Sequence, residues 1–569
     1  MTRIYKIADQ YVERVAALNP LAATGMGVPG HDAEMPDYSP DGAAAMAAMV
    51  RATIAELRAA VVEGERDRVA RDGMLDRLEL SVEQYEAGEY RRGLNILSCP
   101  LQSVRSTFDL MPRETAEHWS NIAARMRLVP ETLAGYRRSL REGIETGMPS
   151  TQRQTAECAK QCAVWTGRAE GHADRTPFFS RLLEAFDGAE VDDAALRAEL
   201  EAGAAAATGA YAEMGTYLGE QYRPEAEPRD PVGIDRYRFG VRAYLGAELD
   251  LEETYEWGWE ELRRLDAEMA ETAQRIAPGD ALAAVKELLG SDPERSIEGV
   301  DEFRRWMQEL QETTIAELNG THFDIAEPVQ RIEAMIAPPG GALAMYYTGP
   351  SEDFSRPGRT WYPTGGKTRF PLWTEVSVAY HEGVPGHHLQ IATTRHMGDE
   401  LSRFQRLMGG TSGYVEGWAL YAERLMAELG YLEHPDYYLG MLISQAFRAA
   451  RVIIDIGMHL ELPIPAASDF HPGETWEPGI ALDFLDLYVP FEHAFAVSEI
   501  DRYLGVPGQA ISYKVGERHW LEARAQARQR ASGDGTEFDL KDWHARAFAL
   551  GPMGLAQMQR ELGGSGGGA

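Results

Sequence analysis

Apolar residues recur every three or four positions along most of the chain, a pattern that predicts amphipathic helices separated by short loops. Before residue 220 the clearest such stretches are residues 41–63, 71–89 and 193–218, which are rich in Ala, Leu, Glu and Arg. These residue types favour helix, and no motif typical of an active site occurs among them. The pattern returns after residue 250 and dominates from residue 371 to about residue 549. The sequence therefore predicts a mainly α-helical protein.

One segment departs from this helical pattern. Residues 329–337 (VQRIEAMIA) alternate between apolar and polar as a half-buried strand does, and residues 342–347 (ALAMYY) are compatible with a second strand. Residues 349–370 carry turn-forming residues throughout and predict a loop that forms a wall or lid. We expect a small β-hairpin or sheet here, whose edge either pairs with an extended peptide or is purely structural.

The length of the chain and a proline-rich stretch within it predict two lobes. At 569 residues the chain exceeds the usual size of a single hydrophobic core. Three prolines within residues 222–233 (YRPEAEPRDPVG) make that stretch the best candidate boundary. We predict an N-terminal helical lobe over residues 1–225, a second helical lobe over residues 226–562, and a flexible glycine-rich tail over residues 563–569.

Composition narrows the choice of partners. A net charge of −33 argues against binding to nucleic acid or to anionic membrane surfaces, because both would repel the protein. No run of 18 apolar residues is present, and the first residues lack the apolar core of a signal peptide, so we expect a cytoplasmic protein. Three cysteines are too few for a disulfide framework. The sequence leaves the oligomeric state open.

The densest group of reactive side chains is residues 381–388, HEGVPGHH. This segment resembles the HExxH signature of zinc proteases, in which two histidines one helical turn apart bind Zn²⁺ and the glutamate activates water. His381 and Glu382 match the first half of that signature, but Pro385 stands where the second histidine belongs. Glu382 is therefore the candidate general base, and the second histidine ligand must come from elsewhere.

The two available histidines, His387 and His388, lie six and seven residues after His381. An unbroken helix would place them about 9 to 10 Å along its axis from His381, too far for two nitrogens about 2.1 Å from one zinc ion. Pro385 and Gly386 are the residues expected to break the helix. Either histidine is then a candidate ligand. The alternative is that these histidines only bind backbone carbonyls at a helix break.

Four blocks together carry a family resemblance: HEGVPGHHLQ, GYVEGWALYAE from Gly413, QAFRAARVIIDIGMH from Gln445, and SEIDRYLGVPGQAISYKVGER from Ser498. They resemble the bacterial domain-of-unknown-function 885 family. The resemblance implies a mostly helical, two-lobed fold related to the gluzincin metallopeptidases, a group that includes angiotensin-converting enzyme and carboxypeptidase Taq. It implies no particular substrate.

In gluzincins the third metal ligand is a glutamate on a following helix. Residues 414–429 predict such a helix, which carries Glu416 and Glu423 on nearly one face. Because the helix is largely apolar, a carboxylate on it is costly unless it is paired or bound to a cation. Glu416 is the candidate third ligand of a Zn²⁺ ion, or else a partner in a buried salt bridge. Glu423 fits a supporting or surface carboxylate better than a ligand.

The predicted helix over residues 438–460 carries a polar stripe. Arg451, Asp455 and His459 are spaced by four, and Arg448 lies three residues before Arg451. Arg448 and Arg451 are candidates for binding a substrate carboxylate, and His459, oriented by Asp455, is a candidate donor to a transition-state oxyanion. The alternative is an internal ladder of ion pairs between helices.

Three further residues complete the list of candidates. Tyr513, in a helix predicted over residues 507–517, either donates its phenol hydrogen to the oxyanion or is a core residue. Lys514, beside it, and Arg356, in the turn-rich loop, are candidates for substrate binding. Ser498 and Asp501 have the spacing of a helix start.

Together these features predict a zinc-dependent hydrolase that cleaves peptide or other amide bonds in short peptides or peptide-like metabolites. Glu382 would take a proton from water and pass it to the leaving amine. Two alternatives remain. The altered motif could serve different chemistry on a small molecule in natural-product metabolism, or the chain could be a non-catalytic binding protein on a degenerate peptidase fold.

Overall fold

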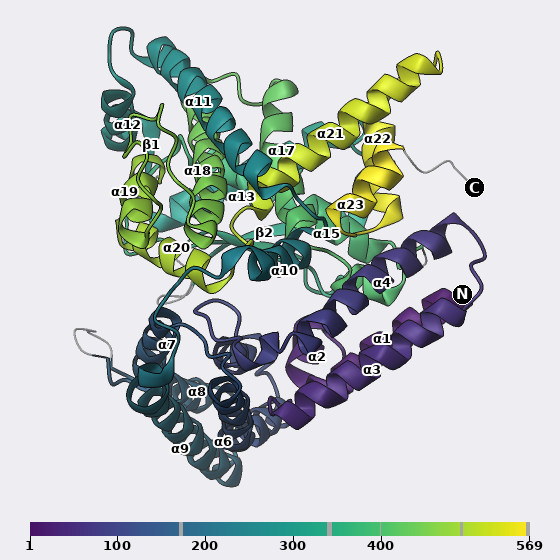
Figure 1. Ribbon diagram of the computed structural model, residues 1–569, viewed down its shortest axis with the longest axis vertical. Helices are drawn as coiled ribbons and strands as arrows, with labels where there is room; N and C mark the ends of the chain where they lie inside the picture. The colour runs from purple at the N-terminus through teal and green to yellow at the C-terminus, as the bar shows by residue number, and fades with distance from the viewer. Residues whose placement is uncertain (170–174, 338–343, 399, 490–492, 565–569) are drawn as a thin grey trace. The chain divides into compact units, whose positions relative to one another are not determined.

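The protein is mainly helical, with a few short strands. The structure, a computed structural model, describes residues 1–169, 175–337, 344–398, 400–489 and 493–564 (Figure 1). The chain forms two compact units, and the change between them at Val232 and Gly233 falls at the end of the proline-rich stretch. Of the predicted glycine-rich tail, residues 565–569 lie outside the described part.

The first unit comprises residues 1–63, 77–232 and 504–506. Its helices are α1 Arg3–Leu18, α2 Pro20–Met26, α3 Pro40–Ala59, α5 Pro100–Leu110, α6 Ala116–Glu145, α7 Gln152–Trp165, α8 Phe178–Asp187 and α9 Ala194–Thr216, with short helical turns η1 Glu89–Arg91, η2 Tyr217–Tyr222 and η3 Arg223–Glu225. The long helices α6 and α9 pack along each other and enclose an aromatic core that contains Trp119, Phe179 and Tyr211. The three cysteines of the chain are free and buried in this unit.

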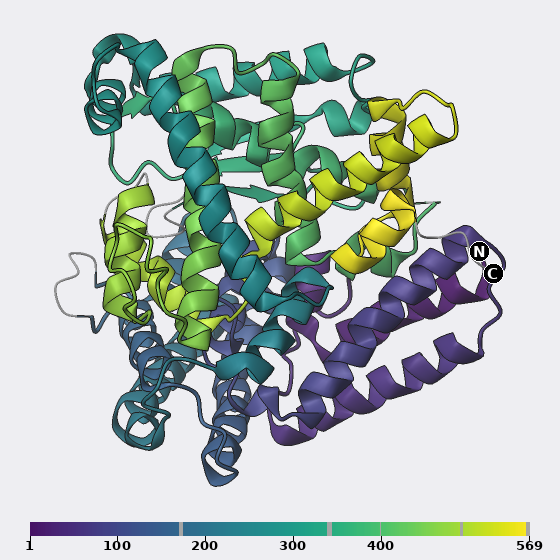
Figure 2. The ribbon, with the colours of Figure 1, turned by 45° about the horizontal axis from the view of Figure 1, so that its top comes forward.

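The second unit comprises residues 64–76, 233–503 and the chain from residue 507 onward. Helix α4 Glu65–Glu86 begins in it and ends in the first unit. Its other helices are α10 Gly233–Leu245, α11 Leu251–Ile276, α12 Leu282–Ser291, α13 Val300–Leu318, α14 Glu375–Glu382, α15 His387–His396, α16 Arg403–Met408, α17 Ser412–Glu428, α18 Pro435–Leu460, α19 Pro478–Tyr488, α20 His493–Gly505, α21 Ser512–Gly533, α22 Leu540–Leu550 and α23 Leu555–Met558, with short turns η4 Pro293–Arg295, η5 Glu327–Gln330 and η6 Gln559–Gly563. Its most extensive helix–helix contacts join α11 to α18 and α17 to α21 (Figure 2).

Glycines allow α17 and α21 to approach each other closely. A Cβ atom on Gly417 would lie 2.4 Å from the carbonyl carbon of Gly516, and a Cβ on Gly516 would lie 2.2 Å from the carbonyl oxygen of Gly413. Neither distance is possible for a real side chain, so only glycine fits the crossing. This contact matters for function because α17 carries Glu416 and α21 carries Tyr513.

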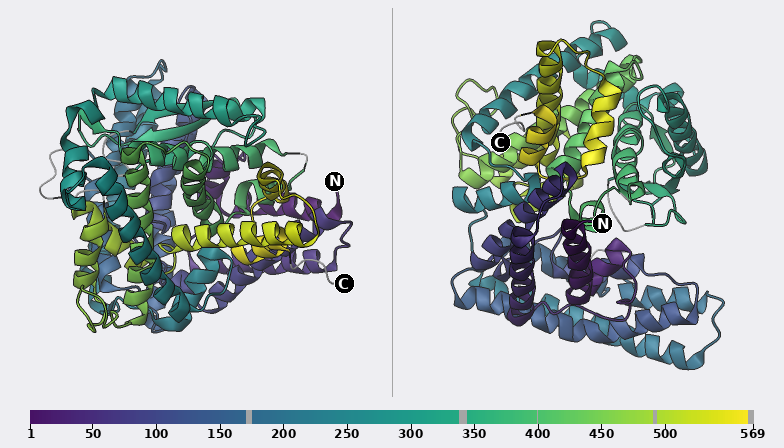
Figure 3. Two further views of the ribbon diagram at one scale, coloured as in Figure 1. Left: turned by 90° about the horizontal axis from the view of Figure 1, so that it is seen from above. Right: turned by 90° about the vertical axis from the view of Figure 1, so that its right-hand side faces the viewer.

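The strands form two small sheets. β1 Ser296–Glu298 pairs antiparallel with β5 Arg369–Pro371. The second sheet has the order β2-β4-β3, in which β4 Gly358–Tyr362 is parallel to β2 Ile332–Ile336 and antiparallel to β3 Tyr346–Thr348. Helix α13 packs against β2, as the left view of Figure 3 shows.

The predicted hairpin is therefore wrong in detail, although a small sheet is present. The two expected strands do not pair with each other, because β4 lies between them. That central strand comes from the segment predicted to be a loop. Its burial alternates along Gly358, Thr360 and Tyr362, but prolines and glycines on both sides hide this short pattern in the sequence. Residues 342 and 343, the start of the second expected strand, lie outside the described residues.

Two other expectations can be compared with the structure. Ser498 lies inside α20 and does not begin a helix, so the expected helix start there is wrong. Among the described residues, no helix combines the length and apolar character needed to cross a lipid bilayer.

Candidate metal centre

The helix breaks where the sequence predicts. Helix α14 ends at Glu382 and α15 begins at His387. Between them, a Cβ atom on Gly386 would lie 2.0 Å from the carbonyl oxygen of His381, so only glycine allows the chain to fold back so tightly onto the end of α14. The close turn lets residues from both helices face the same point.

Trp418 of α17 holds this break in place. Its indole N–H lies 2.9 Å from the carbonyl oxygen of Pro385 and 3.2 Å from that of Gly386, and donates to both. The Trp418 side chain is fully buried. Because Trp418 lies two residues after Glu416, one helix both fixes the break and supplies the carboxylate that faces it.

Three side chains converge on one point in the arrangement of a metal site. Oε2 of Glu416 lies 3.4 Å from Nε2 of His381 and 3.3 Å from Nε2 of His387. Ligands about 2.0 to 2.1 Å from a tetrahedral zinc ion are about 3.3 Å apart, so these distances fit zinc. This Glu416 oxygen is shielded from solvent and has no hydrogen-bond partner in the described part of the chain. Ligand atoms of His381, Glu382 and His387 also lie within 4.8 Å of one another.

His381 is oriented by a second carboxylate. Its Nδ1 lies 2.8 Å from Oε1 of Glu423, and the other oxygen of Glu423 accepts a 2.5 Å hydrogen bond from Ser377. An imidazole held in this way at Nδ1 presents Nε2 to a metal, an arrangement common among metal-binding histidines. Burial alone would lower the pKa of His381, but Glu416 and Glu423 outweigh it and raise that pKa to about 9. Glu423 thus orients His381 on the side of the ring that faces away from Glu416.

His388 faces away from this cluster. Its Nε2 donates to the carbonyl oxygen of Val329 at 2.7 Å, and its Nδ1 accepts from the Tyr347 hydroxyl at 3.0 Å. Burial lowers its pKa to about 4, so the ring is neutral with both nitrogens occupied. Of the two candidate histidines, the structure brings only His387 to Glu416.

Glu382 lies beside the cluster and lines a cavity in the second unit. Burial raises the pKa of its carboxyl, while the charges of His387 and His381 act in the opposite direction. The cavity has a volume of about 530 Å³ and is lined by α14, α18 and α21 and by the chain around β3, β4 and β5. Such a volume is typical of small-ligand pockets.

Two predicted arginines and Tyr513 line the same cavity. Arg451 is paired, since it donates to Glu499 at 2.8 Å and to the Tyr503 hydroxyl at 3.0 Å. Arg448, by contrast, has no carboxylate within 4.0 Å among the residues that the structure describes, and its buried Nε lacks a hydrogen-bond partner.

The Tyr513 ring stacks on His381, with ring centroids 6.3 Å apart. Burial raises the pKa of its phenol, so Tyr513 keeps its hydrogen and can donate it. The Arg448 guanidinium, which donates to the carbonyl oxygen and hydroxyl of Ser444 but pairs with no carboxylate in the described residues, thus lies with a phenol near the histidine cluster.

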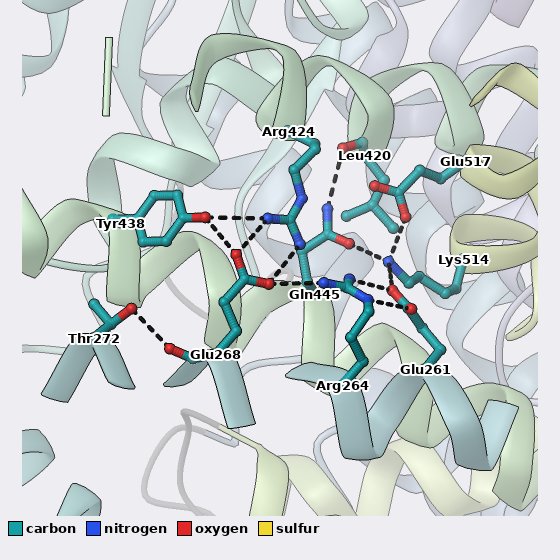
Figure 4. Close-up of polar contacts among 10 residues, drawn as sticks. All are labelled: Glu261, Arg264, Glu268, Thr272, Leu420, Arg424, Tyr438, Gln445, Lys514 and Glu517. Carbon is teal, nitrogen blue, oxygen red and sulfur yellow. Dashed lines mark hydrogen bonds and ion pairs between the residues drawn. The ribbon is translucent and has the colours of Figure 1, made fainter. Parts of the chain in front are cut away.

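Lys514 does not line this cavity. Its buried ammonium contacts Glu261 of α11 at 2.9 Å, Glu517 at 2.5 Å and the Gln445 amide oxygen of α18 (Figure 4). The network continues through Arg264 to Glu268, Arg424 and Tyr438. Lys514 is occupied in joining helices of the second unit.

His459 and Arg356 also lie outside the cavity lining. His459 contacts the carbonyl oxygen of Tyr503 at 3.0 Å, and its Nε2 lies 3.7 Å from Asp455. Asp455 accepts from the hydroxyl of Tyr237, and burial raises its pKa to about 7. The stripe on α18 therefore divides: its arginines line the cavity, and Asp455 and His459 form an internal polar cluster.

Comparison with known proteins agrees with the helical architecture. A family model, DUF885, described as bacterial protein of unknown function, matches residues 20–562. The chain belongs to the DUF885 family. No curated protein matches it.

Two solved structures share the fold of this DUF885 chain. One, from Colwellia psychrerythraea, has a TM-score of 0.82 at 22% identity and covers 98% of both chains. The other, from Shewanella oneidensis, has a TM-score of 0.71 at 17% identity and covers 98% of this chain and 99% of its own. Both are described as a "putative lipoprotein", the second of unknown function.

Sequence reasoning missed three residues that shape this site. Trp418 lies within a family block, but nothing in its spacing indicates that it binds the Pro385–Gly386 turn. Tyr347 was expected only as part of a strand, and its contact with His388 spans 41 residues of sequence. Glu375 could have been predicted, because it precedes Glu382 by seven residues and therefore lies on the same face of the helix.

Proposed function

We propose that the protein is a zinc-dependent hydrolase of the gluzincin type that cleaves peptide or other amide bonds of short peptides or peptide-like metabolites. One observation carries the proposal: a shielded carboxylate oxygen of Glu416, which makes no hydrogen bond in the described residues, lies at tetrahedral ligand distances from Nε2 of both His381 and His387. Glu382 adjoins this cluster in a cavity large enough for a short peptide.

In this proposal His381, His387 and Glu416 hold Zn²⁺. When bound, the ion would polarise a carbonyl group and make water more acidic. Glu382 takes the proton from water and delivers it to the leaving amine, and burial suits it to this exchange because it disfavours a permanently charged carboxylate.

Tyr513 and Arg448 stabilise the negative charge that develops on the carbonyl oxygen, or bind a carboxylate of the substrate, because both line the cavity with donor groups available. A cavity of about 530 Å³ accommodates small ligands and excludes folded proteins.

Metal content and turnover test the proposal together. We expect purified protein to carry close to one Zn²⁺ per chain, and His381→Ala and Glu416→Ala to lose it, because each change removes a direct ligand. Glu382→Gln keeps the shape of the side chain but loses the basic oxygen, so it should retain zinc and lose at least about 10²-fold in turnover. Elemental analysis, and a screen of peptides and acyl amides with and without chelator, measure these quantities.

Exposed Glu327 offers a matched control, since Glu327→Gln makes the same chemical change away from the cavity and should alter neither zinc nor turnover. A wild type that neither contains nor accepts Zn²⁺ would overturn the metalloenzyme. Full zinc content in Glu416→Ala would remove that residue from the ligands. Near-normal turnover in Glu382→Gln would place the base elsewhere.

A further inference from the structure

One face of α14 extends the cavity well beyond the histidine cluster. Thr374, Glu375, Val378, His381 and Glu382 all line it, and their spacing places them on one side of the helix. Glu375 precedes Glu382 by seven residues, which corresponds to about 10 Å along the helix axis. The cavity therefore holds a second carboxylate at a distance from the proposed general base.

The Glu375 carboxylate lacks a matching charge. Its Oε2 is shielded from solvent and has no hydrogen-bond partner within the described residues. Burial raises its pKa to about 7, while Lys367 and a hydrogen bond with Thr374 act weakly in the other direction. Lys367 itself is exposed, so solvent screens its charge. A shielded carboxylate without a cation is unfavourable for folding, which suggests a role other than stability.

The opposite end of the cavity is basic. Helix α18 packs against the start of α14 at Gly440, where a Cβ would lie 1.8 Å from the carbonyl oxygen of Trp373. Arg448 lies eight residues further along α18, which corresponds to about 12 Å along the helix axis. There its positive charge acts to lower the pKa of Glu382, at the end of α14. The two helices thus run in the same direction beside the cavity.

Charged groups line the cavity at both ends, and Lys367 and Arg369 are among its lining residues. Arg369 donates to Ser291 and Ser296, and neither cation forms an ion pair with Glu375 in the described part of the chain. Glu375 lies at the end where α14 begins, and Arg448 lies at the end where α14 finishes, next to the histidine cluster. Val378 and Ile443 line the stretch between the two.

We propose that Glu375 is a cation subsite that binds a positively charged nitrogen of the substrate, either the α-ammonium group of a short peptide or a basic side chain. The inference rests on the proposed function and adds the charge of the substrate to it. An extended peptide covers about 10 Å in three residues, so an α-ammonium group at Glu375 would precede the scissile bond by about three residues. A basic side chain would reach Glu375 from a residue nearer that bond.

Calorimetry with three synthetic peptides on the zinc-loaded, full-length Glu382→Gln protein tests this subsite without turnover. The peptides are Ala-Ala-Ala-Phe-Ala with free ends, the same peptide N-acetylated, and the N-acetylated peptide with lysine at its second position. We expect a cationic peptide to bind at least about tenfold more tightly than the neutral acetylated one, the scale of a charge-assisted hydrogen bond. The free-amine and lysine peptides distinguish the two sources of charge.

Adding Glu375→Gln should abolish this preference, whereas adding Glu327→Gln should preserve it. Because Glu375→Gln removes a shielded carboxylate that has no ion pair in the described residues, the thermal midpoint of this variant should not fall, whereas a structural role for Glu375 would lower it. Equal affinity for all three peptides, a preference that survives Glu375→Gln, or failure of every peptide to bind would each overturn the subsite.

Hydrolysis of the same peptides is measured separately, on zinc-loaded protein that retains Glu382. Hydrolysis without a charge preference would leave the hydrolase and remove the subsite. A Glu375-dependent preference without hydrolysis would keep the subsite and remove the hydrolase.

Discussion

Two adjacent histidines have opposite surroundings in this structure. Successive residues of a helix point about 100° apart, so His387 and His388 cannot readily serve one small ion. His387 faces Glu416, and its Nδ1 has no partner among the described residues. His388 is held by Val329 and Tyr347 and lies against Gly358 of β4. The motif contains one candidate ligand and one structural residue.

We predict unequal effects of alanine at these two positions. His387→Ala should lose most of the bound zinc, because it removes a ligand. His388→Ala should keep zinc but lower the free energy of unfolding by about 1 to 3 kcal/mol, because it leaves buried partners unsatisfied. Zinc content and denaturant unfolding of the two purified variants measure this. Two fully metallated variants, or the reverse order, would contradict the arrangement.

At the scale of an element, α17 organises the site. One face directs Glu416 to the histidines, Trp418 binds the turn before α15, and Glu423 holds His381 from behind. Gly417 brings the same helix against α21, which carries Tyr513. Small displacements of α17 would therefore change ligand distances and the position of the phenol together.

We predict that Gly516→Ala disturbs this crossing. The added methyl group would meet the backbone of Gly413 at 2.2 Å, so the two helices must separate. The free energy of unfolding should fall by about 1 to 3 kcal/mol, the usual range for overpacking, and zinc affinity should fall with it. Gly533→Ala in the same helix is the matched control, because no atom lies within 4 Å of its added Cβ. Equal stability of the two variants would show that α17 and α21 tolerate separation.

At the scale of the whole molecule, the described residues of the proposed site all belong to the second unit. The network around Lys514 also lies within that unit and connects α11, α17, α18 and α21 (Figure 4). Zinc should therefore stabilise the unit that holds it, while the first unit gains nothing directly. The cytoplasmic location and the absence of nucleic-acid and membrane partners stay predictions.

We predict that removing zinc by dialysis against chelator lowers the melting temperature of the second unit. A ligand that binds only the folded state adds about 2.7 kcal/mol when its concentration is a hundred times its dissociation constant. Calorimetric scans of the zinc-loaded and zinc-free protein should therefore differ, and added Zn²⁺ should restore the loaded profile. Glu416→Ala provides the control, since its profile should not respond to zinc. Identical scans of the two wild-type forms would contradict zinc binding by the native state.

The sequence by itself determined the helical class and the candidate chemistry. Periodicity located the long helix α9, expected over residues 193–218 and found over Ala194–Thr216, because one helical face is buried along its length. Pro385 and Gly386 predicted the helix break from local backbone chemistry. The residues expected around the metal, His381, Glu382, His387 and Glu416, do meet in the structure.

Tertiary structure decided what depends on distant neighbours. The choice between His387 and His388 rests on Val329, Tyr347 and Glu416, none of which is local to the motif. Strand β4 exists because β2 and β3 flank it, so its five residues have no clear signal alone. Lys514 and Tyr513 are adjacent in sequence but point into different surroundings, because successive helical residues face different directions. Periodicity identifies the buried face of a helix, but only packing determines which residues that face meets.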